Sequence, residues 1–130
     1  IKEHPFSNKI EMIQGSSIDR DIIRDIQNIS GNFNKILVCL DSNHTHEHVY
    51  RELCLYSEFV SLGSYCIVFD TVIEHLPNEC CKDRPWSVGN NPLTAVKEWL
   101  IENKNFRVDE LYDKKSLISV AKGGFLERFK

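Results

Sequence analysis

The chain has 130 residues, of which 42% are hydrophobic and 27% charged, and its formal net charge at pH 7 is −3. This composition is typical of one soluble globular domain with a core of its own. The small negative charge provides no basic field for a phosphate backbone, so we expect no nucleic-acid partner. No apolar run approaches the ~20 residues of a membrane span, so we expect no membrane partner either.

The five cysteines do not have the spacing of a zinc site. Cys80 and Cys81 are adjacent and lack a Cys-x-x-Cys partner. Cys39, Cys54 and Cys66 fall within apolar or amphipathic runs, where a free thiol behaves as a small hydrophobic group. An odd number of cysteines in buried positions indicates a reducing compartment, and we expect a cytoplasmic protein.

The first third of the chain predicts a strand, a helix and a second strand. Residues 9–14 alternate polar and apolar side chains up to the turn at 15–17, as in a short strand. Isoleucines recur at helical spacing over residues 18–29 and predict an amphipathic helix. Apart from Lys35, residues 35–40 are continuously apolar, as is typical of a strand buried on both faces of a parallel sheet.

After these elements the sequence predicts a helix at residues 46–60, a strand at 63–69 and a long polar loop at 71–91. A helix at 92–100 and two short strands at 117–120 and 125–129 follow. Pro92 suits a first helical position because its missing N–H is not needed there. Strands that alternate with helices indicate an α/β fold, with a parallel sheet, right-handed crossovers and helices on both faces.

Two of the predicted strands are followed directly by an acid, Asp41 and Asp70. Ligands of such sheets bind beyond the carboxyl ends of the strands, where the turn at 15–17 would also lie. The two carboxylates could share a hard divalent cation such as Mg²⁺. The alternatives are that Asp41 caps the following helix and that Asp70 bonds its own backbone in a turn.

Other polar or aromatic residues are weaker candidates. His44 is the histidine nearest the strand end and could act as a general base. His44 and His48 would share a helix face, but a histidine pair without a third ligand is weak evidence for zinc, and a solvated first turn is an equal alternative. By itself, the turn at 15–17 is an ordinary turn. Trp86 lies in a loop that could close over a substrate, whereas Trp99 is expected within a helix, either in the core or facing a partner.

Residues 35–77 resemble the cephalosporin hydroxylase family, whose members look like class I S-adenosylmethionine (SAM)-dependent methyltransferases and include sugar and macrolide O-methyltransferases. In this central block the resemblance rests on Leu-Asp-Ser-x-His at 40–44, Glu-Leu and Leu-Tyr at 52–53 and 55–56, Val-Ser-x-Gly-Ser-Tyr at 60–65 and Asp-Thr at 70–71. Outside it, His-Pro at 4–5, Gly-Ser-Ser at 15–17, Asn-Pro-Leu at 91–93 and Gly-Phe-Leu at 124–126 are also similar to the family, so the resemblance covers nearly the whole chain.

The resemblance implies roles for individual residues. Gly15, Ser16 and Ser17 would lie at the adenine end of SAM, and Asp41 near its methionine end. Asp41 and Asp70 would bind Mg²⁺, and Asp41 and His44 would be the catalytic residues. Metal-binding members of the family have an acid where this chain has Phe69. The acceptor would be a small molecule with a hydroxyl group.

The resemblance also implies an incomplete Rossmann-like sheet. The class I strand order is 3-2-1-4-5-7-6, and this chain would supply strands 3 to 7, with the first two strands missing. Residues 1–130 would be the C-terminal part of a single methyltransferase-like domain, without the glycine-rich cofactor loop. Strand 3 would then have no neighbour. Such a chain rearranges, pairs with another chain as in a homo-oligomer, or belongs to a longer protein.

Two functions follow as hypotheses. The first is a SAM-dependent O-methyltransferase-like protein that acts on a hydroxyl of a sugar or small metabolite and is inactive as this fragment. The alternative is a non-catalytic interaction module that retains the fold, favoured by Phe69 and by the absence of the glycine-rich loop. A magnesium-dependent phosphotransfer or receiver-like domain ranks last, because the sequence lacks a phosphate loop and a suitable lysine.

Overall fold

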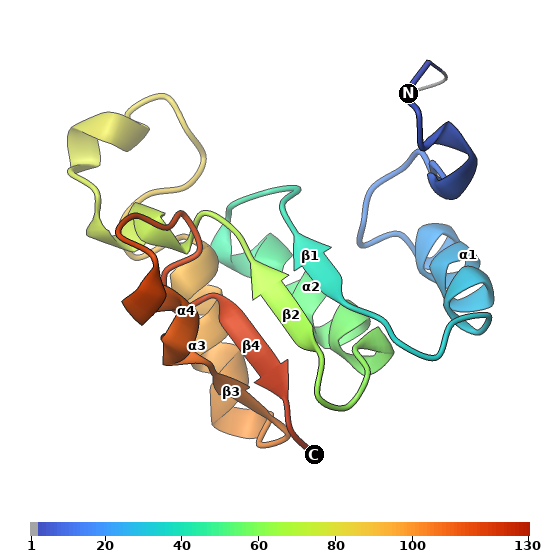
Figure 1. The fold of residues 1–130 in the computed structure, drawn as a ribbon. Helices are drawn as coiled ribbons and strands as arrows, with labels where there is room; N and C mark the ends of the chain where they lie inside the picture. Colours follow the sequence, from blue (N-terminus) through green and yellow to red (C-terminus); the bar gives the residue numbers. More distant parts are fainter. Residues whose placement is uncertain (1–2) are drawn as a thin grey trace.

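A computed structural model describes residues 3–130, in which helices and strands alternate along the chain (Figure 1). The helices are α1 (Arg20–Ser30), α2 (His46–Tyr56), α3 (Pro92–Glu102) and α4 (Glu110–Lys115), and the strands are β1 (Val38–Leu40), β2 (Tyr65–Val68), β3 (Phe106–Val108) and β4 (Phe125–Arg128). Short 3₁₀ helices span Ser7–Lys9, Ser57–Phe59, Thr71–His75 and Asn78–Cys81. The predicted α/β class is confirmed.

The sheet has the strand order β1-β2-β4-β3. β1 and β2 are parallel, with Leu40 opposite Val68, whereas β4 is antiparallel to both of its neighbours. The expectation of a parallel sheet therefore holds for β1 and β2 and is wrong for β4. After α4 the chain turns back at Gly123, whose φ of 72° is left-handed, and β4 enters the sheet in the direction opposite to β3.

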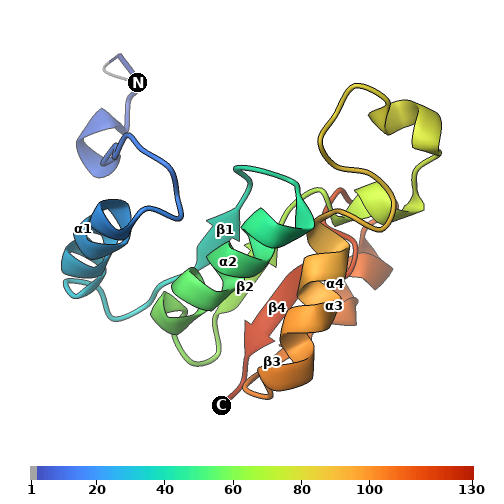
Figure 2. The same cartoon turned by 180° about the vertical axis from the view of Figure 1, so that it is seen from behind.

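The two faces of the sheet are covered unequally. Helices α2 and α3 pack side by side on one face and enclose the hydrophobic core (Figure 2). Side chains alternate along β2, so Cys66 and Val68 are buried while Tyr65 is only partly covered. On the second face, Tyr112 of α4 stacks on Phe125 and meets the edge of Tyr65.

The third helix begins where the sequence predicts. The Asn91 side chain accepts hydrogen bonds from the N–H groups of Leu93 and Thr94, and Pro92 occupies the first helical turn. Trp99 of this helix is 1% exposed and packs edge-on against Phe106, with ring centroids 5.1 Å apart. Of the two positions expected for Trp99, the core is confirmed.

The strand predicted at residues 9–14 is wrong. Residues Ser7–Lys9 form a 3₁₀ helix, and no β-ladder includes residues 10–14. This segment lies apart from β1 (Figure 1). An alternating pattern makes a strand only beside a partner, because an isolated extended segment leaves its backbone groups unpaired.

The tail also differs from its prediction. The strand predicted at 117–120 is absent from the described chain, and Leu117 and Ile118 are fully exposed there. The predicted final strand is confirmed as β4, while β3 and α4 were not predicted. β3 has only three residues, too few for alternation to be recognised.

All five cysteines are free, but they are not uniformly buried. Cys66 and Cys81 are buried, whereas Cys39 and Cys54 are exposed, contrary to the expectation from their apolar neighbours. Burial raises the pKa of the Cys66 thiol to about 12, so this thiol stays protonated and acts as a core group. Over residues 3–130, none of the helices is both long and apolar enough to cross a lipid bilayer.

Candidate functional site

The carboxyl ends of β1 and β2 lie side by side. Leu40 pairs with Val68 in parallel register, and the Phe69 N–H donates to the Leu40 carbonyl oxygen at 3.0 Å. Both strands therefore end at the same level of the sheet. Asp41 and Asp70 follow these ends, and the structure brings them to one edge, as the sequence predicted.

His44 lies between these two carboxylates. Its Nε2 atom is 3.2 Å from Asp70 Oδ2 and 3.4 Å from Asp41 Oδ1. One donor atom from each of the three residues lies within 4.8 Å of the others, and we call this group the Asp41–His44–Asp70 cluster. Trp86, from the long loop, contacts the His44 ring at a centroid distance of 4.8 Å.

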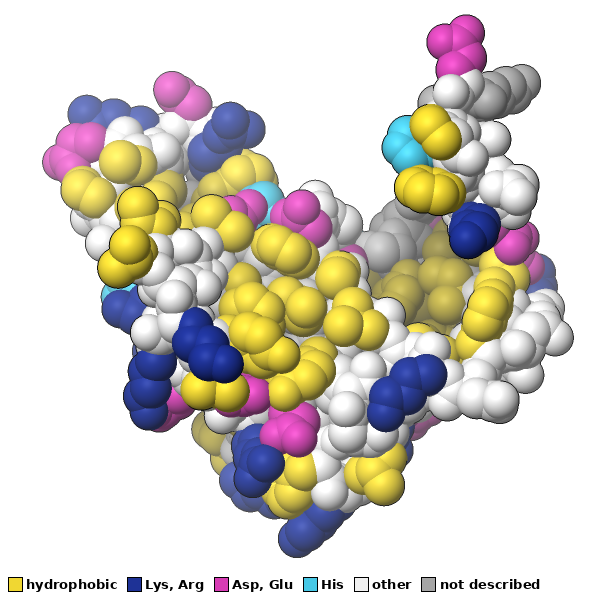
Figure 3. All heavy atoms as spheres, in the orientation of Figure 1, with side chains coloured by type: hydrophobic (Ala, Val, Ile, Leu, Met, Phe, Trp, Pro, Cys, Tyr) yellow, Lys and Arg dark blue, Asp and Glu magenta, His cyan; other side chains and the backbone are white. Residues whose placement is uncertain are grey.

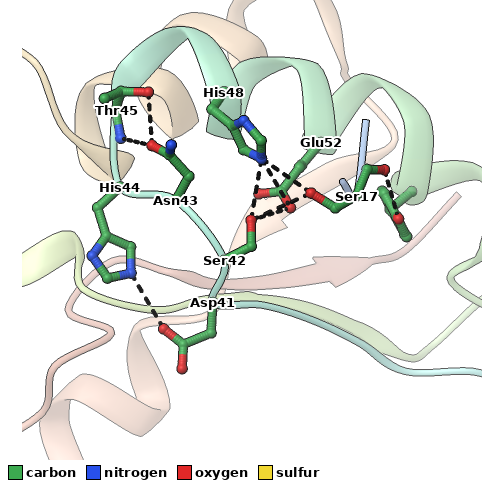
Figure 4. Close-up of polar contacts among 9 residues, drawn as sticks. Ser17, Asp41, Ser42, Asn43, His44, Thr45, His48 and Glu52 are labelled. Atoms are coloured by element: carbon green, nitrogen blue, oxygen red, sulfur yellow. Dashed lines mark hydrogen bonds and ion pairs between the residues drawn. The ribbon is translucent and has the colours of Figure 1, made fainter. Parts of the chain in front are cut away.

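The loop between β1 and α2 directs His44 toward the sheet edge. Asn43 Oδ1 accepts hydrogen bonds from the N–H and hydroxyl groups of Thr45, both at 2.9 Å (Figure 4). Thr45 is the N-cap residue of α2, so Asp41 does not cap this helix. Asp70 precedes a 3₁₀ helix without a side-chain capping bond, and its φ of 52° is left-handed. Both carboxylates thus remain available to the cluster.

The donor set of this cluster fits a divalent cation. Mg²⁺ is commonly held by one or two carboxylates and keeps several of its waters. Asp41 and Asp70 could supply the two carboxylates. His44 adds an imidazole nitrogen that Mg²⁺ does not need but transition metals accept. The sequence marked His44 only as a candidate base. Its position three residues after Asp41 was the available signal for its proximity to the carboxylates.

A second polar group adjoins the first and joins three segments of the chain (Figure 4). Ser17 Oγ is 3.0 Å from His48 Nε2 and 3.3 Å from Ser42 Oγ. The Ser42 hydroxyl donates to Glu52 Oε1 at 2.7 Å, and His48 Nε2 lies 3.2 Å from Ser42 Oγ. We call these four residues the Ser17–Ser42–His48–Glu52 network.

The sequence analysis did not predict the Ser17–Ser42–His48–Glu52 network. His48 and Glu52 are four residues apart on α2 and so share a helix face, which was the available signal. Of the three residues predicted at the adenine end of the cofactor, only Ser17 enters the network. Gly15 and Ser16 are exposed beside it.

A cavity of about 280 Å³ lies between the network and Asp41. It is lined by Ser17, Cys39, Leu40, Asp41, Ser42, Glu52 and Tyr56. The Tyr56 hydroxyl closes one side by donating to the Ser17 carbonyl oxygen at 2.7 Å. The cavity thus connects the predicted cofactor turn with the predicted catalytic acid.

The long loop is fastened beside the site by Glu74. This carboxylate accepts hydrogen bonds from the Gly89 N–H at 2.8 Å and from the Asn91 side chain. These bonds, with the backbone bond from Gly89 as the larger cause, lower the pKa of Glu74. His46 adds a second link, because its N–H donates to Asn90 Oδ1 at 3.0 Å. The loop that carries Trp86 is therefore held at both α2 and α3.

Ionisable side chains beyond the carboxyl ends of two parallel strands, next to a lined cavity, define a ligand-binding α/β protein. Over residues 1–129 the chain matches the family described as rhamnosyl O-methyltransferase/CmcI. The chain belongs to this family of methyltransferases, and the resemblance to the cephalosporin hydroxylase group is confirmed at that level. Searches of curated proteins and of solved structures found no match.

Proposed function

We propose that this protein is a SAM-dependent O-methyltransferase that acts on a hydroxyl group of a sugar or small natural product. The observation that carries the proposal is the Asp41–His44–Asp70 cluster, which lies at the ends of β1 and β2 in a chain of this family. When bound, SAM supplies the methyl group that the acceptor oxygen receives.

The chain's own residues would position the acceptor and take its proton. His44 Nε2 faces two carboxylates that hold the ring in place, so the second ring nitrogen, Nδ1, would accept the hydroxyl proton. Trp86 shields the ring from one side. Asp41 and Asp70 would hold Mg²⁺, which would stabilise negative charge on the acceptor oxygen. Holding the hydroxyl in line with the methyl group would supply much of the rate.

We further propose that the chain supplies one half of a class I sheet. The order β1-β2-β4-β3, with an antiparallel β4, corresponds to strands 4-5-7-6 of the class I order. A hollow lies between the N-terminal segment and the sheet (Figure 3). Strands placed in this hollow would pair with the free edge of β1. Cofactor binding would then need strands that residues 1–130 do not form, from the same protein or from a second chain.

Calorimetric titration with SAM tests both parts. We expect the full-length gene product to bind SAM with micromolar affinity and the 130-residue chain to bind at least about tenfold more weakly. Failure of the full-length protein to bind would contradict the methyltransferase proposal. Equal binding by both would contradict the need for further strands.

The second candidate is a non-catalytic interaction module. Phe69 favours it, because this residue adjoins Asp70 at the strand end and offers no carboxylate to a metal. Replacement Phe69→Glu in the full-length protein distinguishes the two. A gain in Mg²⁺ affinity would show a metal site that lacks one ligand, whereas no gain would support the interaction module.

A further inference from the structure

Glu52 is a buried acid with one unused oxygen. Its side chain is 2% exposed, and Oε1 accepts the Ser42 hydroxyl at 2.7 Å. The second oxygen, Oε2, is buried and has no hydrogen-bond partner. A buried acceptor without a partner is costly, and such groups in native proteins have a functional or solvent partner.

The surrounding donors are already engaged. Ser42 donates to Glu52 Oε1, and Tyr56 donates to the Ser17 carbonyl oxygen. Ser17 Oγ lies within hydrogen-bond distance of His48 and Ser42. Among the residues that line the cavity, none is a lysine or arginine, and Asp41 adds a second carboxylate. The side chains that line the cavity therefore offer two carboxylates and no cationic donor.

We propose that Glu52 Oε2 binds a primary amino group of the ligand that occupies this cavity. An N–H donor would fill the one unsatisfied position, and two nearby carboxylates favour an amine over an acidic group. The inference rests on the proposed function, because SAM carries two such groups, the purine 6-amino group and the α-ammonium group. Both groups offer N–H donors, and Glu52 Oε2 could accept a hydrogen bond from either.

The test compares S-adenosylhomocysteine with two analogues on the full-length gene product. In one analogue oxygen replaces the purine 6-amino group, and in the other the α-amino group is absent. We expect one analogue to bind the wild-type protein about tenfold more weakly than S-adenosylhomocysteine. This comparison needs no variant and does not depend on how a replacement folds.

The variant Glu52→Gln then assigns the loss to Glu52. The amide keeps an oxygen for the Ser42 hydroxyl but places an NH₂ group where Oε2 lies. We expect the variant to bind S-adenosylhomocysteine about tenfold more weakly and to discriminate between it and the analogue by less than about threefold. Glu47→Gln is the matched control, because Glu47 lies on the same helix with a side chain 81% exposed.

Two results overturn the proposal in distinguishable ways. If the wild-type protein does not bind S-adenosylhomocysteine, both the proposed function and this subsite are wrong. If it binds and neither analogue loses affinity, or if the loss persists in a folded Glu52→Gln protein, the subsite alone is wrong and the network only holds Ser17 against α2.

Discussion

His44 Nε2 lies 3.2 Å from Asp70 Oδ2, although a helix and a strand separate the two residues along the chain. Two features produce this contact. The parallel register of β1 and β2 places the strand ends side by side, and the Asn43 side chain holds the loop that carries His44. The proposed base and the proposed metal ligands thus lie in the segments that directly follow two paired strands.

We predict that the two members of this contact have different roles in metal binding. Asp70→Asn should weaken Mn²⁺ binding about tenfold or more, because an amide replaces a charged ligand. His44→Gln should change it by less than about threefold if His44 is a base and not a ligand. Electron paramagnetic resonance of free Mn²⁺ measures both, and Asp21→Asn in exposed α1 is the control.

Equal losses in Asp70→Asn and His44→Gln would make His44 a metal ligand and would exclude it as the base. An unchanged affinity in Asp70→Asn would contradict the metal site itself.

Trp86 should report occupancy of the site. Its ring contacts His44 at a centroid distance of 4.8 Å, whereas Trp99 is buried in the core. Addition of Mn²⁺ should change the tryptophan fluorescence of the wild-type protein, because the metal binds next to the Trp86 ring. The Trp86→Phe protein should retain Trp99 emission but lose this response. A response that survives in Trp86→Phe would place the bound metal elsewhere.

Gly124 should not tolerate a side chain. A Cβ at this position would collide with the Val68 carbonyl oxygen, where the Val68 N–H also donates to the Gly124 carbonyl at 2.9 Å. We expect Gly124→Ala to lower the free energy of unfolding by about 2 to 3 kcal/mol, since β2 and β4 must separate. Urea denaturation measures the change.

Gly31→Ala is the matched control for this measurement. Gly31 has a φ of −59°, and its nearest contact from an added Cβ would be 3.7 Å, to the Gln27 carbonyl oxygen. It should change stability by less than about 1 kcal/mol. Equal effects of the two replacements would contradict the steric argument.

Glu74 should contribute stability that depends on pH. Its pKa is lower in the folded protein than the ~4.3 of an unperturbed glutamate, chiefly through the Gly89 N–H. The contribution is therefore complete above the unfolded pKa and is lost as the pH falls through the lower folded pKa. We expect Glu74→Gln to cost about 1 to 2 kcal/mol at pH 7.

The same reasoning predicts that the wild-type and Glu74→Gln stabilities begin to converge as the pH falls below the unfolded pKa of ~4.3, and that they meet below the lower folded pKa. Urea denaturation between pH 3 and pH 7 measures this, with exposed Glu47→Gln as the control for loss of one surface charge. A difference that stays constant down to pH 3 would show that Glu74 does not act through its charge.

Hydrophobic pattern predicted the elements that form the core. The apolar run before Asp41, the stripe along α2 and the Pro92 start of α3 are strong local signals, and each element appears in the structure. The hydrophobic pattern gave wrong predictions where pairing with a neighbouring strand decides whether a segment forms a strand. Residues 9–14 alternate as a strand but have no ladder among the described residues, whereas the three residues of β3 form a strand because β4 lies beside them.

By itself the sequence determined that Asp41 and Asp70 stand at the ends of strands, because an apolar run that ends in an acid marks a strand end. The burial of both strand faces was not determined, since Cys39 in β1 is exposed. The sequence also carried enough family signal to indicate a methyltransferase. Only the tertiary structure placed His44 between the two acids and left Glu52 Oε2 without a partner. The physical reason is that periodicity specifies which face of a helix is buried, whereas the rotation of α2 over the sheet specifies what that face meets.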